Sequence, residues 1–218
     1  MVKKMVGYEE DYHSYFHKHL LTNEKYYNFR ARYANKKYWK YLKAKNTGQF
    51  LELGIGLGQN MFCHKDQSQG VDISDFCIKK CEERGIKVHK DIAKLPSHSF
   101  DGMLSVHCLE HLEDPARFIK HMNRVLKYGG RLVLVLPHEN SKPRKFEPSV
   151  DQHLYNWTFQ SIGNLLHKNG FEVIKNKFNY AHGFSMFYWL PDFISYPLLA
   201  GLGLFRDCKE MVVVAEKK

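Results

Sequence analysis

The cysteines of this 218-residue chain form no disulfide framework. Its five cysteines are odd in number and include no C-x-x-C pair, so we expect reduced thiols. The chain also lacks internal repeats and low-complexity tracts. Its length and its hydrophobic content of 44% therefore predict one globular domain of ordinary size.

The sequence has no apolar leader and no ordinary membrane span. The first twelve residues, MVKKMVGYEEDY, contain no signal-peptide core, so we expect a cytoplasmic protein. The most apolar stretch, 183–205, carries one charge, Asp192. Because Pro191 and Pro197 would break a helix there, it does not have the pattern of a spanning segment.

A glycine run, ELGIGLG at 52–58, is the most informative motif present. It follows an apolar lead, so Gly54 and Gly56 fall where a strand ends, and they allow a cofactor to lie against bare backbone. A dinucleotide site would show G-x-G-x-x-G. Glu52 before the run would repel a pyrophosphate but suits a cofactor with a cationic amine.

Acids follow at the ends of the next two predicted strands. Asp72 ends the short strand in QGVDIS, where a carboxylate can accept both hydroxyls of a ribose. Asp91 ends another strand in GIKVHKD. A cap for Asp72 or a local turn bond for Asp91 is the structural alternative.

Five motifs in this order resemble the class I S-adenosylmethionine-dependent methyltransferases, in particular the small-molecule subgroup of the type 11 and type 23 domains. The motifs are ELGIGLG, VDIS, KDIAKLP, SFDGMLSVHCLEHLEDP and GGRLVLVLP, within residues 48–176. The resemblance implies S-adenosylmethionine as cofactor. It assigns the cofactor's methionine part to Glu52, Gly54, Gly56 and His107, its ribose to Asp72, and its adenine to Ile73, Asp91 and Ile92.

The fold class that we predict is α/β, with a doubly wound, mostly parallel seven-stranded sheet of the Rossmann-like methyltransferase type. Strands alternate with helices from 49 to 137, which places helices on both faces of the sheet. We expect a helix over 58–66 and a final antiparallel edge strand within 209–218 beside 171–176. A helical arm over 1–47 precedes the core at 48–176, and an apolar insertion with the final strand occupies 177–218.

The N-terminal arm is both basic and aromatic. Residues 1–48 hold eleven Lys and Arg against four Asp and Glu, with eleven aromatic residues. Such a mixture can bind RNA by charge and stacking. Because the aromatic residues recur every three or four positions, we favour two packed helices, 8–21 and 24–44, that cover the cofactor.

The apolar insertion at 179–207 has three interpretations. It is a lid over an acceptor pocket, a homodimer surface, or a peripheral membrane contact through 183–205 that would place the protein at the inner membrane surface. Basic residues in the arm and beyond the ends of the insertion keep the third interpretation open.

We expect methyl transfer to oxygen or nitrogen of a small-molecule acceptor, with a sugar or a lipid-linked envelope precursor as candidates. Transfer from a sulfonium needs alignment more than acid, and His138, His153 and Tyr155 follow the strand that ends at Pro137. The two histidines are the candidate bases. We expect no metal. An RNA methyltransferase and a non-catalytic cofactor-binding protein are the alternatives.

Overall fold

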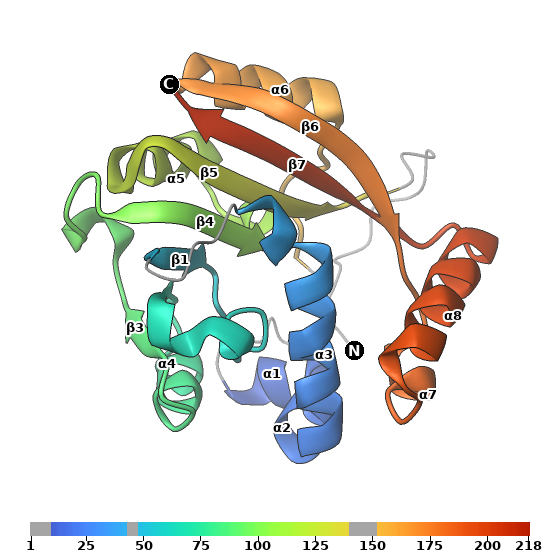
Figure 1. Ribbon diagram of the computed structural model, residues 1–218. Coiled ribbons are helices and arrows are strands. Elements are labelled where there is room, and N and C mark those ends of the chain that lie inside the picture. The colour runs from blue at the N-terminus through green and yellow to red at the C-terminus, as the bar shows by residue number, and fades with distance from the viewer. Residues whose placement is uncertain (1–9, 43–47, 140–151) are drawn as a thin grey trace, which may run out of the picture.

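A seven-stranded sheet forms the centre of the computed structural model, which describes residues 10–42, 48–139 and 152–218 (Figure 1). The strands are β1 (Phe50–Leu53), β2 (Ser68–Val71), β3 (Lys87–His89), β4 (Phe100–Val106), β5 (Leu126–Pro137), β6 (Phe171–Tyr180) and β7 (Lys209–Lys217). Their order is β3-β2-β1-β4-β5-β7-β6, with β7 antiparallel to both of its neighbours. The sheet is mostly parallel and ends in a hairpin, as predicted.

Helices cover both faces of this sheet. The α-helices are α1 (Glu10–Phe16), α2 (Lys18–Thr22), α3 (Glu24–Lys37), α4 (Asp75–Glu82), α5 (Pro115–Val125), α6 (Phe159–Lys168), α7 (Phe184–Phe187) and α8 (Asp192–Phe205). Short 3-10 turns are η1 (Trp39–Tyr41), η2 (Phe62–Gln67), η3 (Ile92–Lys94) and η4 (Leu109–His111). Helices α5 and α6 pack on one face, and α3, α4 and α8 on the other.

Successive side chains of β5 point to opposite faces of the sheet, so this one strand contributes to two hydrophobic cores. Leu132 and Leu134 belong to the core beneath α5 and α6, while Val133 and Val135 belong to the core beneath α3 and α8. Successive side chains of a strand point to opposite faces, so an unbroken apolar run fits a strand covered on both sides.

The predicted position of the last strand was wrong in one respect. Strand β7 is antiparallel beside β6, but it lies inside the sheet, and β6 forms the edge. The physical reason is in the side chains. The run from Met211 to Ala215 is buried, whereas β6 exposes Glu172, Lys175 and Asn176. Charged residues are typical of an edge strand.

Two predicted helices also differ from the structure. The segment 58–66 holds only the 3-10 turns of η2, where the backbone of His64 leaves the helical region (φ −131°). The first arm helix breaks at His17 into α1 and α2. Positions 8, 9, 43 and 44 of the predicted arm helices lie outside the described residues.

Candidate active site

A cavity of about 810 Å³ opens at the carboxyl ends of the parallel strands. The loops after β1, β2, β4 and β5 line it, together with the arm and the start of the β6–β7 connection. In open α/β sheets, ligands bind at this end of the strands. The volume falls in the range of small-molecule sites.

The two glycines after β1 meet different steric needs. Both have a left-handed backbone, with φ +71° at Gly54 and +55° at Gly56. A Cβ on Gly54 would lie 2.5 Å from the Cys108 Sγ, whereas a Cβ on Gly56 would meet no atom within 4 Å. Gly54 therefore allows two loops to approach each other, and Gly56 leaves open space beside a cavity-lining backbone.

Asp72 holds the glycine loop against the end of β2. Its carboxylate accepts from the Gly56 amide at 2.8 Å and from the Ser74 amide at 3.0 Å. Helix α4 is capped by Ser74, whose hydroxyl accepts from the Cys77 amide. Asp72 is thus not the helix cap. It lines the cavity, and its ribose role stays a prediction.

Glu52 lies one layer behind the cavity. Its side chain is fully buried, and the Asn60 amide, which lines the cavity, donates to Oε1 at 2.7 Å. Burial raises the pKa of Glu52 well above its usual range, against the bond from Asn60. Glu52 Oε2 and Gln59 Oε1 have no hydrogen-bond partner among the described residues. Such buried acceptors suit an ammonium group.

The predicted adenine residues also line the cavity. Ile73 is 72% exposed there, while Ile92 is buried. One oxygen of Asp91 accepts from the Ala93 amide at 2.8 Å and caps η3. This local bond uses only one oxygen, so the adenine role of Asp91 stays a prediction.

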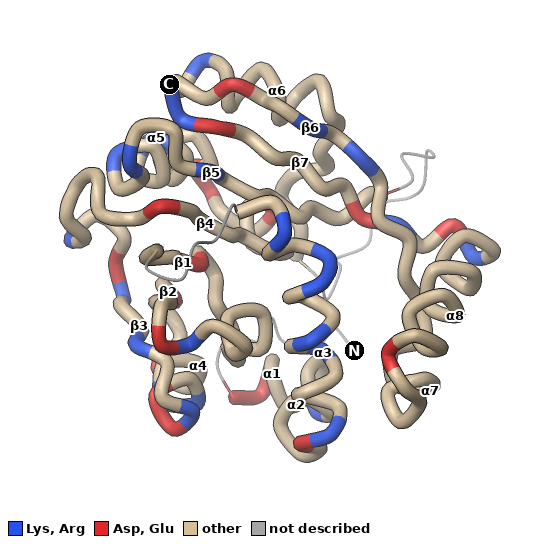
Figure 2. Tube along the Cα trace, in the orientation of Figure 1, with Lys and Arg blue, Asp and Glu red and all other residues tan. Residues whose placement is uncertain are grey.

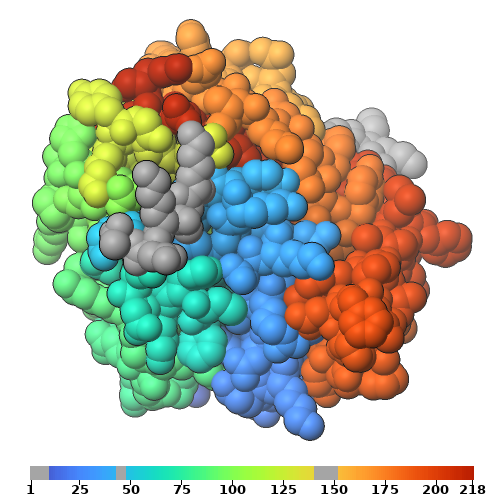
Figure 3. Space-filling model, viewed as in Figure 1, coloured from blue at the N-terminus to red at the C-terminus, as the bar shows by residue number. Residues whose placement is uncertain are grey.

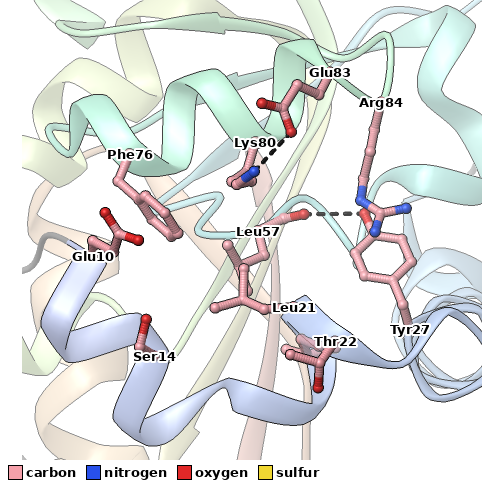
Figure 4. Close-up of a pocket in the computed structure, with 11 residues that line it drawn as sticks. Glu10, Ser14, Leu21, Thr22, Tyr27, Leu57, Phe76, Lys80, Glu83 and Arg84 are labelled. Carbon is pink, nitrogen blue, oxygen red and sulfur yellow. Dashed lines mark hydrogen bonds and ion pairs between the residues drawn. The ribbon is translucent and has the colours of Figure 1, made fainter.

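The arm covers the cavity and is fastened to the glycine loop. Tyr12 and His17 line the cavity. Figure 4 shows the Tyr27 hydroxyl donating to the Leu57 carbonyl, at 3.0 Å, beside a second cavity of about 510 Å³ between the arm and α4. The Arg84 guanidinium lies 3.6 Å from the centre of the Tyr27 ring. The arm therefore packs over the cavity, and its predicted role of covering the cofactor stays a prediction.

A second group of polar side chains lines the cavity around Glu210. Its Oε1 accepts from the Tyr38 hydroxyl at 2.5 Å and from the Asn179 amide at 2.6 Å. Its Oε2 lies 3.1 Å from His107 Nε2. All four residues line the cavity. We call Tyr38, His107, Asn179 and Glu210 the acceptor-end network, after the role proposed for them below. The contact predicted between His107 and the cofactor's methionine part stays a prediction.

The charges of this network are coupled. Burial would lower the pKa of His107, but the nearby carboxylates of Glu110 and Glu210 outweigh burial and raise it to about 9. Burial would raise the pKa of Glu210, yet the bonds from His107, Tyr38 and Asn179 lower it below its usual value. At neutral pH the pair is a charged imidazolium and a carboxylate.

The predicted bases take different places. His138 lines the cavity. His153 lies behind the cavity-lining His111, with ring centres 4.8 Å apart, and its Nδ1 bonds to Glu139. Tyr155 donates to the Glu113 carbonyl. The roles of all three stay predictions.

His153 also takes part in a cluster that offers metal ligands. One ligand atom each from Glu110, His111 and His153 lies within 4.8 Å of the other two. The predicted absence of a metal is therefore untested.

Sequence reasoning missed Tyr38, Asn179 and Glu210. Because β7 is antiparallel, its start lies where the parallel strands end, and β6 brings Asn179 to the same edge beside Glu210. An antiparallel last strand was predicted. Its first residues are polar and should lie at the carboxyl ends of the parallel strands, so they could have indicated Glu210 as a site residue.

Comparisons with known proteins identify a domain family within the chain and proteins that share its fold. Residues 51–134 match the methyltransferase domain family. A SAM-dependent methyltransferase from Thermotoga maritima shares the fold with a TM-score of 0.67 and 21% identity, covering 95% of this chain and 97% of that one.

Two curated relatives match shorter stretches. An uncharacterized protein of Methanocaldococcus jannaschii is 41% identical over 93 residues, 40% of this chain and 43% of its own length. Phosphatidylethanolamine N-methyltransferase of Cereibacter sphaeroides is 27% identical over 101 residues, 40% of this chain and 50% of its own length. The chain thus spans about half the length of the curated relatives it matches.

The residues present fit S-adenosylmethionine. The glycine loop leaves open space for it, the Asp72 carboxylate can accept from its ribose, and the unpartnered Gln59 oxygen of the cavity wall can accept from its ammonium group. The comparisons lead to one conclusion: residues 51–134 match the methyltransferase domain family, and the chain has the fold of S-adenosylmethionine-dependent methyltransferases.

Proposed function

We propose that this protein transfers a methyl group from S-adenosylmethionine to a nitrogen atom of a small molecule bound at the acceptor-end network. The observation that carries the proposal is the Glu210 carboxylate on the cavity wall, held there by bonds from Tyr38, Asn179 and His107. Each carboxylate oxygen has two lone pairs, and Oε2 has one protein partner, His107. An N–H of the acceptor can therefore bind to Oε2.

The chain's own residues would bind and align the reactants. S-adenosylmethionine supplies an electrophilic methyl group on a sulfonium when it is bound. Gly56 and Asp72 hold the cofactor end, and the arm side chains Tyr12 and His17 exclude water from above. Glu210 orients the acceptor nitrogen, and alignment of this kind can contribute several kcal/mol to catalysis. His138, on the same cavity wall, is our candidate to accept the nitrogen's proton.

A nitrogen acceptor is favoured over a sugar hydroxyl by two observations. The aromatic and carboxylate groups at this end, from Tyr33, Tyr38 and Glu210, suit an amine. The relative from Cereibacter sphaeroides is named an N-methyltransferase.

The alternative of an RNA substrate is weakened, because most of the described aromatic rings of the arm are buried. Tyr26, Tyr27, Phe29, Tyr33 and Tyr38 of the arm are all 8% exposed or less. Buried rings are not a platform on which bases can stack. The non-catalytic alternative leaves the acceptor-end network without a role.

Methyl transfer to panels of small amines and small alcohols tests the proposal. We expect turnover with an amine, and we expect Glu210→Gln to lower kcat/KM by about ten- to a hundredfold through the loss of a charge-assisted bond. Glu172→Gln, on the exposed edge strand β6 and outside the residues that line the cavity, is the matched control and should leave turnover unchanged. Transfer to alcohols alone, or full turnover by Glu210→Gln, would contradict the proposal.

A further inference from the structure

The outer face of α8 is apolar along its whole length. Phe193, Ile194, Leu198, Leu204 and Phe205 are exposed, at 75%, 39%, 42%, 64% and 87%. No charged residue occurs between Phe193 and Phe205. The opposite face of the helix packs on the sheet. A surface helix of a globular protein normally shows polar residues to solvent, so this face is built to contact something apolar.

The exposed apolar surface continues onto α7. Met186 is 56% exposed and Trp189, just after α7, is 70% exposed. The indole N–H of Trp189 already donates to the Met186 carbonyl at 2.9 Å, which leaves the ring free for apolar contact. We call these two residues and the exposed face of α8 the α7–α8 surface. In Figure 3 this hairpin forms an outer part of the molecule beside α3.

A row of cations runs beside the α7–α8 surface. Arg32, Lys36 and Lys40 follow each other at four-residue spacing along α3 and η1, and all three are exposed. The row is tied to α8, because Arg32 pairs with Asp192 at 2.9 Å and the Lys36 Nζ lies 5.0 Å from the Tyr196 ring centre. Figure 2 shows the blue segments of α3 next to the nearly uncoloured α7 and α8.

The α7–α8 surface offers no free acidic residue to pair with the cations of this row. Asp192 is the only acid between residues 183 and 205, and Arg32 already occupies it. Within the described ranges, neither Lys36 nor Lys40 has a carboxylate within ion-pair distance. The matching partner is therefore apolar in its centre and anionic at its rim.

We propose that the α7–α8 surface and the Arg32–Lys36–Lys40 row bind the surface of an anionic lipid membrane. Lipid chains accept the apolar side chains and lipid phosphates pair with the cations. A second copy fits less well, because a two-fold dimer through this face would bring two cationic rows to one interface without free acids to pair them.

The helix lies on the membrane rather than across it. None of the helices in the described ranges is both long and apolar enough to cross a bilayer. The 14 residues of α8 extend about 21 Å at 1.5 Å per residue, short of the roughly 30 Å hydrocarbon core. Phe184 of α7 lines the 810 Å³ cavity, so the element that contacts lipid also forms a wall of the site.

Vesicle co-sedimentation of the full chain tests this inference, with phosphatidylcholine vesicles alone or mixed with phosphatidylglycerol. We expect the wild-type protein to bind the anionic vesicles and to be released by salt. Phe193→Asp with Phe205→Asp should weaken binding at least about tenfold through lost apolar burial, and Lys36→Glu with Lys40→Glu should remove the preference for anionic lipid.

The matched control is Tyr128→Asp, because Tyr128 is 74% exposed but lies on β5 against His98. It should leave vesicle binding unchanged, and circular dichroism checks that each variant folds. The inference is overturned by a wild-type protein that ignores anionic vesicles, or by equal binding of Phe193→Asp/Phe205→Asp. It is also overturned if sedimentation equilibrium shows a dimer that the same double variant dissociates.

Discussion

The two ends of the cavity are built in different ways. The cofactor end comes from consecutive strand ends, with Gly54, Gly56 and Asp72 acting largely through backbone geometry. The acceptor end depends on side chains from four elements, and Tyr38 and Glu210 are 172 positions apart in the chain. If the proposed roles hold, the contrast predicts that local backbone geometry fixes the cofactor site, while the choice of acceptor depends on long-range packing.

Among the variants that test this contrast, we expect the largest loss of unfolding free energy for Gly54→Ala. Gly54→Ala adds a Cβ 2.5 Å from the Cys108 Sγ at a left-handed φ, so we expect a loss of about 2 to 4 kcal/mol in unfolding free energy from overpacking and strain. Gly56→Ala is the control, with open space around its Cβ, and should cost only about 1 to 2 kcal/mol. Urea unfolding measures both, and equal losses would show that the two loops do not press together at Gly54.

A second prediction concerns the long-range packing of α8. A Cβ on Gly203 would lie 2.5 Å from the Ala181 backbone nitrogen, whereas one on Gly201 meets nothing within 4 Å. We expect Gly203→Ala to destabilise the fold by about 1 to 3 kcal/mol and Gly201→Ala to stabilise the helix by up to about 1 kcal/mol. Thermal unfolding of the two variants compares them directly. A harmless Gly203→Ala would mean that α8 does not pack closely on the end of β6.

The smallest expected effect is a change of unfolding free energy with pH, caused by two histidines that line the cavity. The folded-state pKa of His107 is raised to about 9, so its stabilisation is complete below the ordinary value of 6.5 and is lost as pH rises through 9. Burial, with charges of His13 and Arg30, lowers the pKa of His17 to about 4, so stability falls as pH drops from 6.5 to 4.

Unfolding free energy measured across pH should therefore be highest near 6.5. The effect of His107 should be modest, because its side chain is 44% exposed and solvent screens the pair. His107→Asn should remove the decline on the alkaline side, and His17→Asn the decline on the acid side. An unchanged profile in both variants would contradict the assignment.

The sequence predicted the features that local residues determine, and it missed those that depend on packing between distant segments. The alternation of strands and glycines predicted the parallel part of the sheet and the loop at Gly54, because local periodicity and backbone geometry determine both. The edge position of β6 was not predicted, since it depends on how β7 is buried from both sides. Glu210 was missed because its partners come from distant elements and no local pattern marks it.

The most direct test of the account is calorimetry of S-adenosylhomocysteine binding to the wild-type protein, Asp72→Ala and Glu210→Gln. Asp72→Ala removes the carboxylate that bonds to the Gly56 amide and lines the cofactor end, so its affinity should fall by about ten- to a hundredfold. Glu210→Gln should bind as the wild-type protein does. Unchanged affinity in Asp72→Ala, or an equal loss in Glu210→Gln, would contradict a cavity divided into a cofactor end and an acceptor end.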